Sequence, residues 1–216
     1  DDVFLTKGFE DQFYKSKRKN LIVIALGCLE KGPACFCDSM GIDPVQAEGV
    51  DIQAYDLGEE LGLEAKTETG EQLLQEITTL LKEDKDVQIP ECKSGGLTVN
   101  TEGITEKLQK MFDHPYWKRL SEKCLGCGIC TYLCPTCHCF DIQSHNWGKE
   151  GIKYRTWDSC MYPDYTLMAG GHNPRPDRPP RVRQRFLHKL QYFPERYNEF
   201  GCVGCGRCIV KCPVNL

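Results

Sequence analysis

The chain lacks a long apolar run. No stretch approaches the roughly 18–20 apolar residues that a membrane-spanning helix needs. The longest run, LIVIALGCL at Leu21–Leu29, predicts a buried strand. No secretory leader is visible, and the sequence does not begin with Met. We therefore expect a protein without a membrane span, and we expect the sequence to be a piece or a processed form of a longer chain.

Motifs for several common chemistries are also missing. No glycine-rich phosphate loop follows a strand, so the sequence gives no support for flavin or nicotinamide binding within this chain. No Ser-His-Asp arrangement is legible. Histidines are few, and for both His138 and His172 we favour a structural role. We identify no catalytic residue, and whether the chain is an enzyme by itself stays open.

Cysteine, in contrast, is abundant, with 15 in 216 residues. An odd number excludes complete pairing in disulfides within the chain. The cysteines are clustered rather than spread along the sequence, and no secretory leader precedes them. Both features favour metal binding in a reducing compartment over a disulfide framework.

Two runs of twelve residues hold eight of these cysteines. CLGCGICTYLCP at Cys124–Pro135 and CVGCGRCIVKCP at Cys202–Pro213 are identical at seven of twelve positions. Both follow C-x2-C-x2-C-x3-C-P, in which three cysteines hold one [4Fe–4S] cluster and the fourth holds its twin. This crossed pairing gives two predicted ligand sets: Cys124, Cys127, Cys130 and Cys212 for cluster one, and Cys202, Cys205, Cys208 and Cys134 for cluster two.

A zinc ribbon is the competing interpretation, and it would make the chain a zinc-binding interaction module. Such a site would use two cysteine pairs, one from the start of each run. It leaves four cysteines and the two prolines, Pro135 and Pro213, without a role. The doubled spacing therefore favours iron–sulfur clusters.

Seven further cysteines have no such spacing. Four lie early in the chain, at Cys28, Cys35, Cys37 and Cys92, and they are enough for a third [4Fe–4S] cluster. The alternative is that they are buried apolar residues, as free cysteine often is. The other three are Cys137, Cys139 and Cys160. For these three we favour a purely structural role. The alternatives are that they shield cluster two, form a site together with a non-cysteine ligand, or hold a substrate-binding cluster.

Charge divides the chain in two. Residues 1–123 hold 15 basic and 24 acidic residues, whereas residues 124–216 hold 12 and 7. We predict an α+β protein with a small N-terminal α/β docking domain over residues 1–100. A mainly helical, ferredoxin-like domain with two [4Fe–4S] clusters follows over residues 101–216. It has an insert of 67 residues between Cys134 and Cys202.

Hydrophobic periodicity places the elements within these domains. It predicts strands at 21–26 and 50–57, and helices at 70–83, 101–123 with a break at Pro115, and 181–193. A linker is expected at 87–96.

A basic stretch holds Arg175, Arg178, Arg181, Arg183 and Arg185. We interpret it as a docking surface for another protein chain or as charge compensation for anionic clusters. A nucleic-acid partner is not expected, because the chain has no aromatic stacking platform and a net negative charge.

Five sequence blocks, two of which extend the cysteine runs, resemble those of a known family. They are the extended first run CLGCGICTYLCPTCHCFDI, WDSCM, MAGGHNPR, RQRFLHKL and FGCVGCGRCIVKCPVNL, with CFCDSMG upstream. The chain resembles the iron–sulfur beta subunits of sulfhydrogenase-type nickel–iron hydrogenases. It is equally similar to the iron–sulfur subunit of anaerobic sulfite reductase and to dicluster proteins associated with heterodisulfide reductases.

The resemblance covers nearly the whole chain. It implies a cytoplasmic, oxygen-sensitive complex of an anaerobe. It also implies that the chain carries electrons between flavin-bearing and catalytic subunits, the catalytic one being, for example, a nickel–iron hydrogenase. Because such electron carriers serve several reactions, the resemblance does not choose the catalytic partner.

Overall fold

The computed structural model describes residues 1–84 and 87–216. The chain forms two compact units, and each is described by itself. The first unit contains residues 1–32 and 41–96, and the second contains residues 33–40 and 97–216. No helix in the described part of the chain is both long and apolar enough to cross a membrane.

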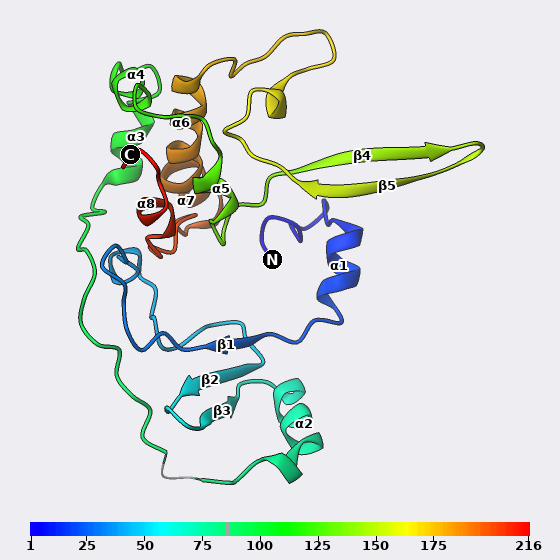
Figure 1. The fold of residues 1–216 in the computed structure, drawn as a ribbon, viewed down its shortest axis with the longest axis vertical. Helices are drawn as coiled ribbons and strands as arrows, with labels where there is room; N and C mark the ends of the chain where they lie inside the picture. Colours follow the sequence, from blue (N-terminus) through cyan, green and yellow to red (C-terminus); the bar gives the residue numbers. More distant parts are fainter. Residues whose placement is uncertain (85–86) are drawn as a thin grey trace. The chain divides into compact units, whose positions relative to one another are not determined.

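The first unit is a three-stranded sheet with short helices. Its elements are α1 (Gln12–Arg18), β1 (Ile24–Leu26), β2 (Ile52–Asp56), β3 (Leu61–Ala65), α2 (Glu68–Glu76) and a 3₁₀ turn, η2 (Thr78–Leu80). The strand order is β1-β2-β3 (Figure 1). β1 runs parallel to β2, and β3 runs antiparallel to it. Because β2 is central, it supplies the core of this unit.

The core residues of β2 include one polar side chain. Ile52, Ala54 and Tyr55 are buried, and Gln53 is fully buried between them. The Gln53 amide nitrogen donates to Ala25 O at 3.1 Å, and its oxygen accepts from the Ala47 nitrogen at 3.0 Å. A buried amide is tolerated when its donors and acceptors are satisfied in this way.

The first apolar run does not form a buried strand. β1 has only three residues and lies at the edge of the sheet, where Ile24 and Leu26 are 56% and 62% exposed. The prediction of a buried strand at Leu21–Leu29 is therefore wrong. A parallel strand is buried only when both of its faces are covered, and the faces of an edge strand are not. In the same region, α1 begins where Asp11 caps the Tyr14 nitrogen at 2.8 Å.

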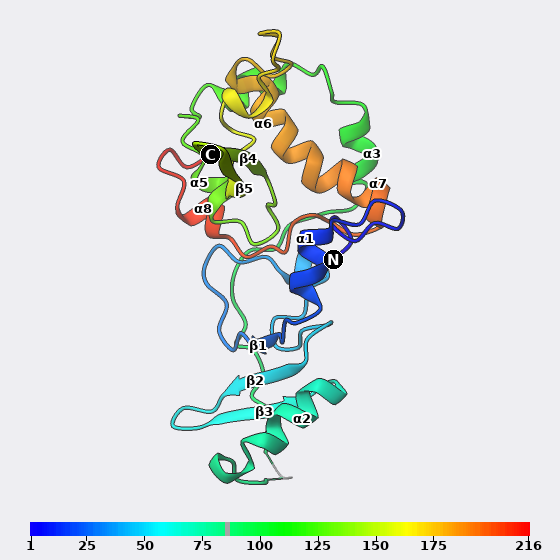
Figure 2. The same ribbon diagram turned by 90° about the vertical axis from the view of Figure 1, so that its right-hand side faces the viewer.

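The second unit holds the remaining elements (Figures 1 and 2). These are η1 (Asp38–Met40), α3 (Ile104–Gln109), α4 (Tyr116–Ser121), α5 (Ile129–Tyr132), β4 (Phe140–Trp147), β5 (Glu150–Trp157), η3 (Asp164–Thr166), α6 (Arg178–Leu187), the π-helix η4 (His188–Tyr192), α7 (Phe193–Tyr197) and α8 (Arg207–Val210).

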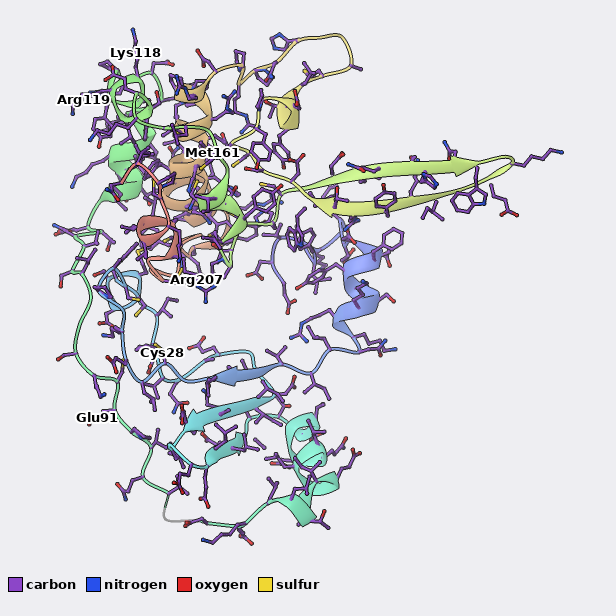
Figure 3. All side chains as sticks on the ribbon, viewed as in Figure 1. Cys28, Glu91, Lys118, Arg119, Met161 and Arg207 are labelled. Atoms are coloured by element: carbon purple, nitrogen blue, oxygen red, sulfur yellow. The ribbon has the colours of Figure 1, made fainter. Side chains whose placement is uncertain are left out.

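Helix α6 is the centre of this unit. Leu187 packs with Leu108 of α3 and Trp117 of α4 in one buried cluster. Five residues earlier, Val182 packs with Met161 and Cys124 in a second cluster. Met161 is labelled in Figure 3. The second cluster fixes the start of the first cysteine run against α6.

The helix continues from α6 to α7 through one π turn. Pro194 has no amide hydrogen, so it cannot donate to the carbonyl four residues earlier, at Leu190. The Thr105 hydroxyl donates to this carbonyl at 2.9 Å. A side chain of α3 thus replaces the lost helical bond and ties α3 to η4.

The long insert is less helical than expected. Its first part is an antiparallel hairpin in which Phe140 pairs with Trp157 and Trp147 pairs with Glu150. This hairpin extends away from the helices of its unit (Figure 1). Only the second part, α6 to α7, is helical as predicted. The sheet content therefore corrects the expectation of a mainly helical domain.

Candidate iron–sulfur centre

The two cysteine runs fold in the same way. In each run a left-handed glycine precedes a one-turn helix: Gly128 has φ 75° before α5, and Gly206 has φ 67° before α8. Two residues before these, Gly126 and Gly204 are also left-handed, with φ 71° and 64°. Glycine adopts this conformation at no steric cost, so the repeated sequence specifies a repeated backbone.

The same loops direct main-chain N–H groups at sulfur. The Gly126 nitrogen lies 3.3 Å from Cys124 Sγ, and the Gly204 nitrogen lies 3.5 Å from Cys202 Sγ. Such hydrogen bonds stabilise a thiolate over a thiol. The loops are therefore suited to hold metal-ligating thiolates.

A cavity of about 440 Å³ lies between the two runs within the second unit. All four cysteines of predicted set one line it, as do Cys202 and Cys208 of set two. Its other walls are mostly apolar, with Phe36, Met161 and Val182 among them. The fold therefore brings Cys212, 82 residues beyond Cys130 in the sequence, to the same cavity as the first run.

Three of the four thiols of set two are neighbours. The electrostatic neighbours of Cys202 include Cys208 and Cys134, so these three thiols lie near one another. Burial raises the pKa of Cys202, and it also raises that of Cys130. Cys205 does not line the cavity; its carbonyl accepts a hydrogen bond from Cys35 Sγ at 3.6 Å.

The segment 33–40 covers the second loop, which sequence reasoning did not find. The Phe36 nitrogen donates to Gly204 O at 2.7 Å. A Cβ on Gly206 would clash with the Ala34 carbonyl oxygen, so only glycine fits there. Phe36 and Met40 also line the cavity and add apolar surface to its wall. The glycines of CVGCGRC were a signal for this close approach.

The four early cysteines fall into two pairs. Cys28 and Cys92 belong to the first unit, where Glu30 and Lys93 form a parallel bridge next to them. Cys35 and Cys37 belong to the second unit. A third cluster held by all four stays a prediction.

The remaining three cysteines lie close to one another near the base of the hairpin. Cys139 and Cys160 share a hydrogen bond, which lowers the pKa of Cys139 and raises that of Cys160. The Cys137 thiol donates to Cys134 and lowers the pKa of Cys134. Cys137 therefore supports a predicted ligand.

Helix α6 directs basic side chains at the cysteine loops. Arg178 donates to Cys124 O at 2.7 Å, and Arg185 donates to Cys137 Sγ at 3.5 Å. Lys189, on η4, donates to Thr136 Oγ1 at 2.8 Å and to Gly201 O at 2.7 Å. The predicted charge compensation named the arginines but missed Lys189, because that residue lies outside the basic stretch.

These residues fit iron–sulfur clusters. The thiols surround a cavity and receive main-chain hydrogen bonds, and soft thiolate ligands select such clusters. Within residues 1–84 and 87–216, no three or more His, Cys, Asp or Glu side chains converge as they would on a single metal ion. The cysteines are instead spread over the walls of a larger space.

Comparison with known proteins agrees with this chemistry. Residues 123–216 match the family of 4Fe-4S dicluster domains. The chain is 34% identical, over its whole length, to sulfhydrogenase 2 subunit beta of Pyrococcus furiosus, and it spans 66% of that protein. No solved structure matches the chain. The chain therefore carries a 4Fe-4S dicluster domain over residues 123–216 and, over its whole length, is similar to a sulfhydrogenase beta subunit.

Proposed function

We propose that this chain is the electron-transfer subunit of a redox complex. It would relay single electrons between flavin-bearing and catalytic subunits, with the hydrogenase type favoured. The observation that supports this best is the pair of matching cysteine loops around one cavity, which holds six of the eight predicted ligands. Each [4Fe–4S] cluster, when bound, supplies one-electron redox chemistry.

The chain's own residues hold the clusters and exclude water. We propose the crossed ligand sets, with Cys212 joining the first run and Cys134 joining the second. Main-chain N–H groups at Gly126 and Gly204 orient the thiolates. Phe36 and Met161 keep the cavity apolar, and low solvent exposure is one of the factors that set a cluster potential.

The catalytic partner is proposed from similarity alone. The relative in Pyrococcus furiosus is named as part of a sulfhydrogenase, which favours a hydrogenase-type partner. Anaerobic sulfite reductase and a heterodisulfide-reductase-linked complex are the alternatives. Copurification from anaerobic extract, followed by assays for hydrogen oxidation and sulfite reduction, separates them. We propose a cytoplasmic location for the complex, with residues 1–100 as its docking domain.

A third cluster on Cys28, Cys35, Cys37 and Cys92 is proposed as part of the same electron path. The proposal rests on their number, because four cysteines are enough to hold one [4Fe–4S] cluster. Its test is stoichiometry, because each added cube brings four irons.

The deciding experiment counts iron and acid-labile sulfide in the anaerobically purified chain, with EPR of its reduced form. About eight of each supports two clusters, and about twelve supports three. Stoichiometric zinc without sulfide would overturn the proposal in favour of an interaction module.

A further inference from the structure

Two cationic side chains face the cluster sites from one side of a continuous helix. Arg185 and Lys189 are four residues apart on α6 and η4, a spacing that keeps two side chains on nearly the same face. Both line the cavity that holds the cysteines. Lys189 is 7% exposed, and Arg185 is half-buried.

Neither cation has a carboxylate partner within the part of the chain that the structure describes. Arg185 contacts a sulfur, and Lys189 contacts a hydroxyl and a main-chain oxygen. Burying an unpaired charge is costly, unless opposite charge lies nearby. Because thiolate ligands are anionic, clusters at the two sites would supply that charge.

The two cations differ in what they reach. Arg185 lines the same cavity as Cys130 of set one and Cys208 of set two, and its charge acts on both of these thiols as well as on Cys134 and Cys137. Burial by itself would lower the pKa of Arg185, but these thiols outweigh it and raise that pKa. Lys189 instead bonds Thr136 and Gly201, which lie beside Cys134 and Cys202 of set two, and its charge acts on these two thiols.

We propose that Arg185 is a shared fixed charge that raises the reduction potentials of both clusters, whereas Lys189 raises the potential of one. This inference rests on the proposed function. Reduction adds one negative charge to a site, and a fixed positive charge a few ångströms away stabilises the reduced state. One guanidinium between both sites would keep the two potentials close together and favour transfer in either direction.

The test is an EPR-monitored redox titration of the full chain with its clusters loaded. In Arg185→Gln we expect both midpoint potentials to fall. In Lys189→Gln we expect one to fall and the other to stay within error. Arg183→Gln is the matched control, since Arg183 lies on the same helix but donates to Phe112 O at 2.9 Å and faces Asp113.

Arg185→Lys separates charge from shape. It keeps the charge, so both potentials should stay near those of the unchanged protein. If Arg185→Lys lowers both potentials as far as Arg185→Gln does, the planar guanidinium shape rather than the positive charge is responsible. That result overturns the proposal. If Arg185→Gln fails to retain clusters, Lys189→Gln still tests the inference, because a fall in both potentials or in neither would overturn it.

Two other results would overturn the inference: unchanged potentials in Arg185→Gln, or a fall in only one of them. Iron and sulfide counts on each variant keep this failure distinct from failure of the proposed function. An unchanged protein without iron and sulfide refutes electron transfer itself. A loaded variant with unaltered potentials refutes only the role of Arg185.

Discussion

The Lys189 ammonium donates a hydrogen bond of 2.7 Å to the main-chain oxygen of Gly201, the residue just before Cys202. Thr136 Oγ1, two residues after Cys134, donates to the same oxygen at 2.7 Å. In return, the Gly201 nitrogen donates to Lys189 O at 2.8 Å. These bonds join the end of one cysteine run to the start of the other.

Thr136→Val should loosen this junction. The change keeps the side-chain shape but removes a hydroxyl that bonds both Gly201 O and the Lys189 ammonium. The Gly201 oxygen and the Lys189 ammonium still bond each other, so the cost is that of the lost hydrogen bonds, about 0.5–1.5 kcal/mol each. We therefore expect faster cluster loss in urea, monitored by visible absorbance. Thr98→Val is the control, because Thr98 lies exposed in the same unit. Equal rates in the two variants would contradict the junction.

Crossed ligation predicts which double variants damage one cluster and which damage two. Cys134→Ala combined with Cys202→Ala should leave one cluster intact, because both thiols belong to predicted set two. Cys134→Ala combined with Cys124→Ala should damage both clusters. Iron counts and the EPR spectra of the reduced forms report the difference. The reverse pattern would show that each run holds its own cluster.

The loop glycines differ in what surrounds them, which gives a graded prediction. Gly126→Ala adds only the strain of a positive φ, about 1–2 kcal/mol, because nothing lies within 4 Å of its new Cβ. The new Cβ of Gly128→Ala would also meet the Tyr162 ring at 2.9 Å, and that of Gly206→Ala would clash with the Ala34 main chain. A side chain can move more easily than backbone, so cluster retention should fall in the order Gly126, Gly128, Gly206. Equal losses in all three would show that φ strain alone decides.

His188 should make stability depend on pH. Burial first, and then the charge of the neighbouring His138 and Lys189, lower the pKa of His188 to about 4. In the unfolded chain its pKa is about 6.5. As the pH falls, His188 therefore binds a proton in the unfolded chain before it does so in the folded chain. The free energy of unfolding decreases as the pH falls from about 6.5 to about 4. Cluster-loss rates in urea should show a weaker pH dependence in His188→Gln than in the unchanged protein. His145→Gln, on the exposed hairpin, should keep the full dependence.

Secondary structure was predictable where local chemistry decides it. The break at Pro115 lies between α3 and α4, and the apolar stripe of the helix predicted at 181–193 continues through α6, η4 and α7. The helix predicted at 70–83 ends at Glu76, because the Thr78 hydroxyl donates to the Leu74 and Gln75 carbonyls and competes with the helical bonds. The hairpin was missed, although Gly148, with φ 59° in a two-residue turn, was a usable signal.

The sequence by itself determined the ligand type and the repeated loop. Cysteine spacing selects the metal chemistry, and glycine at each left-handed position specifies the backbone, because both depend on residues a few positions apart. Only the tertiary structure decided which distant groups meet those loops. Cys212 at the cavity of the first run, Ala34 against Gly206, and Lys189 between Thr136 and Gly201 all depend on how α6 and segment 33–40 pack. Packing of this kind follows from the summed burial of many side chains, which no short motif records.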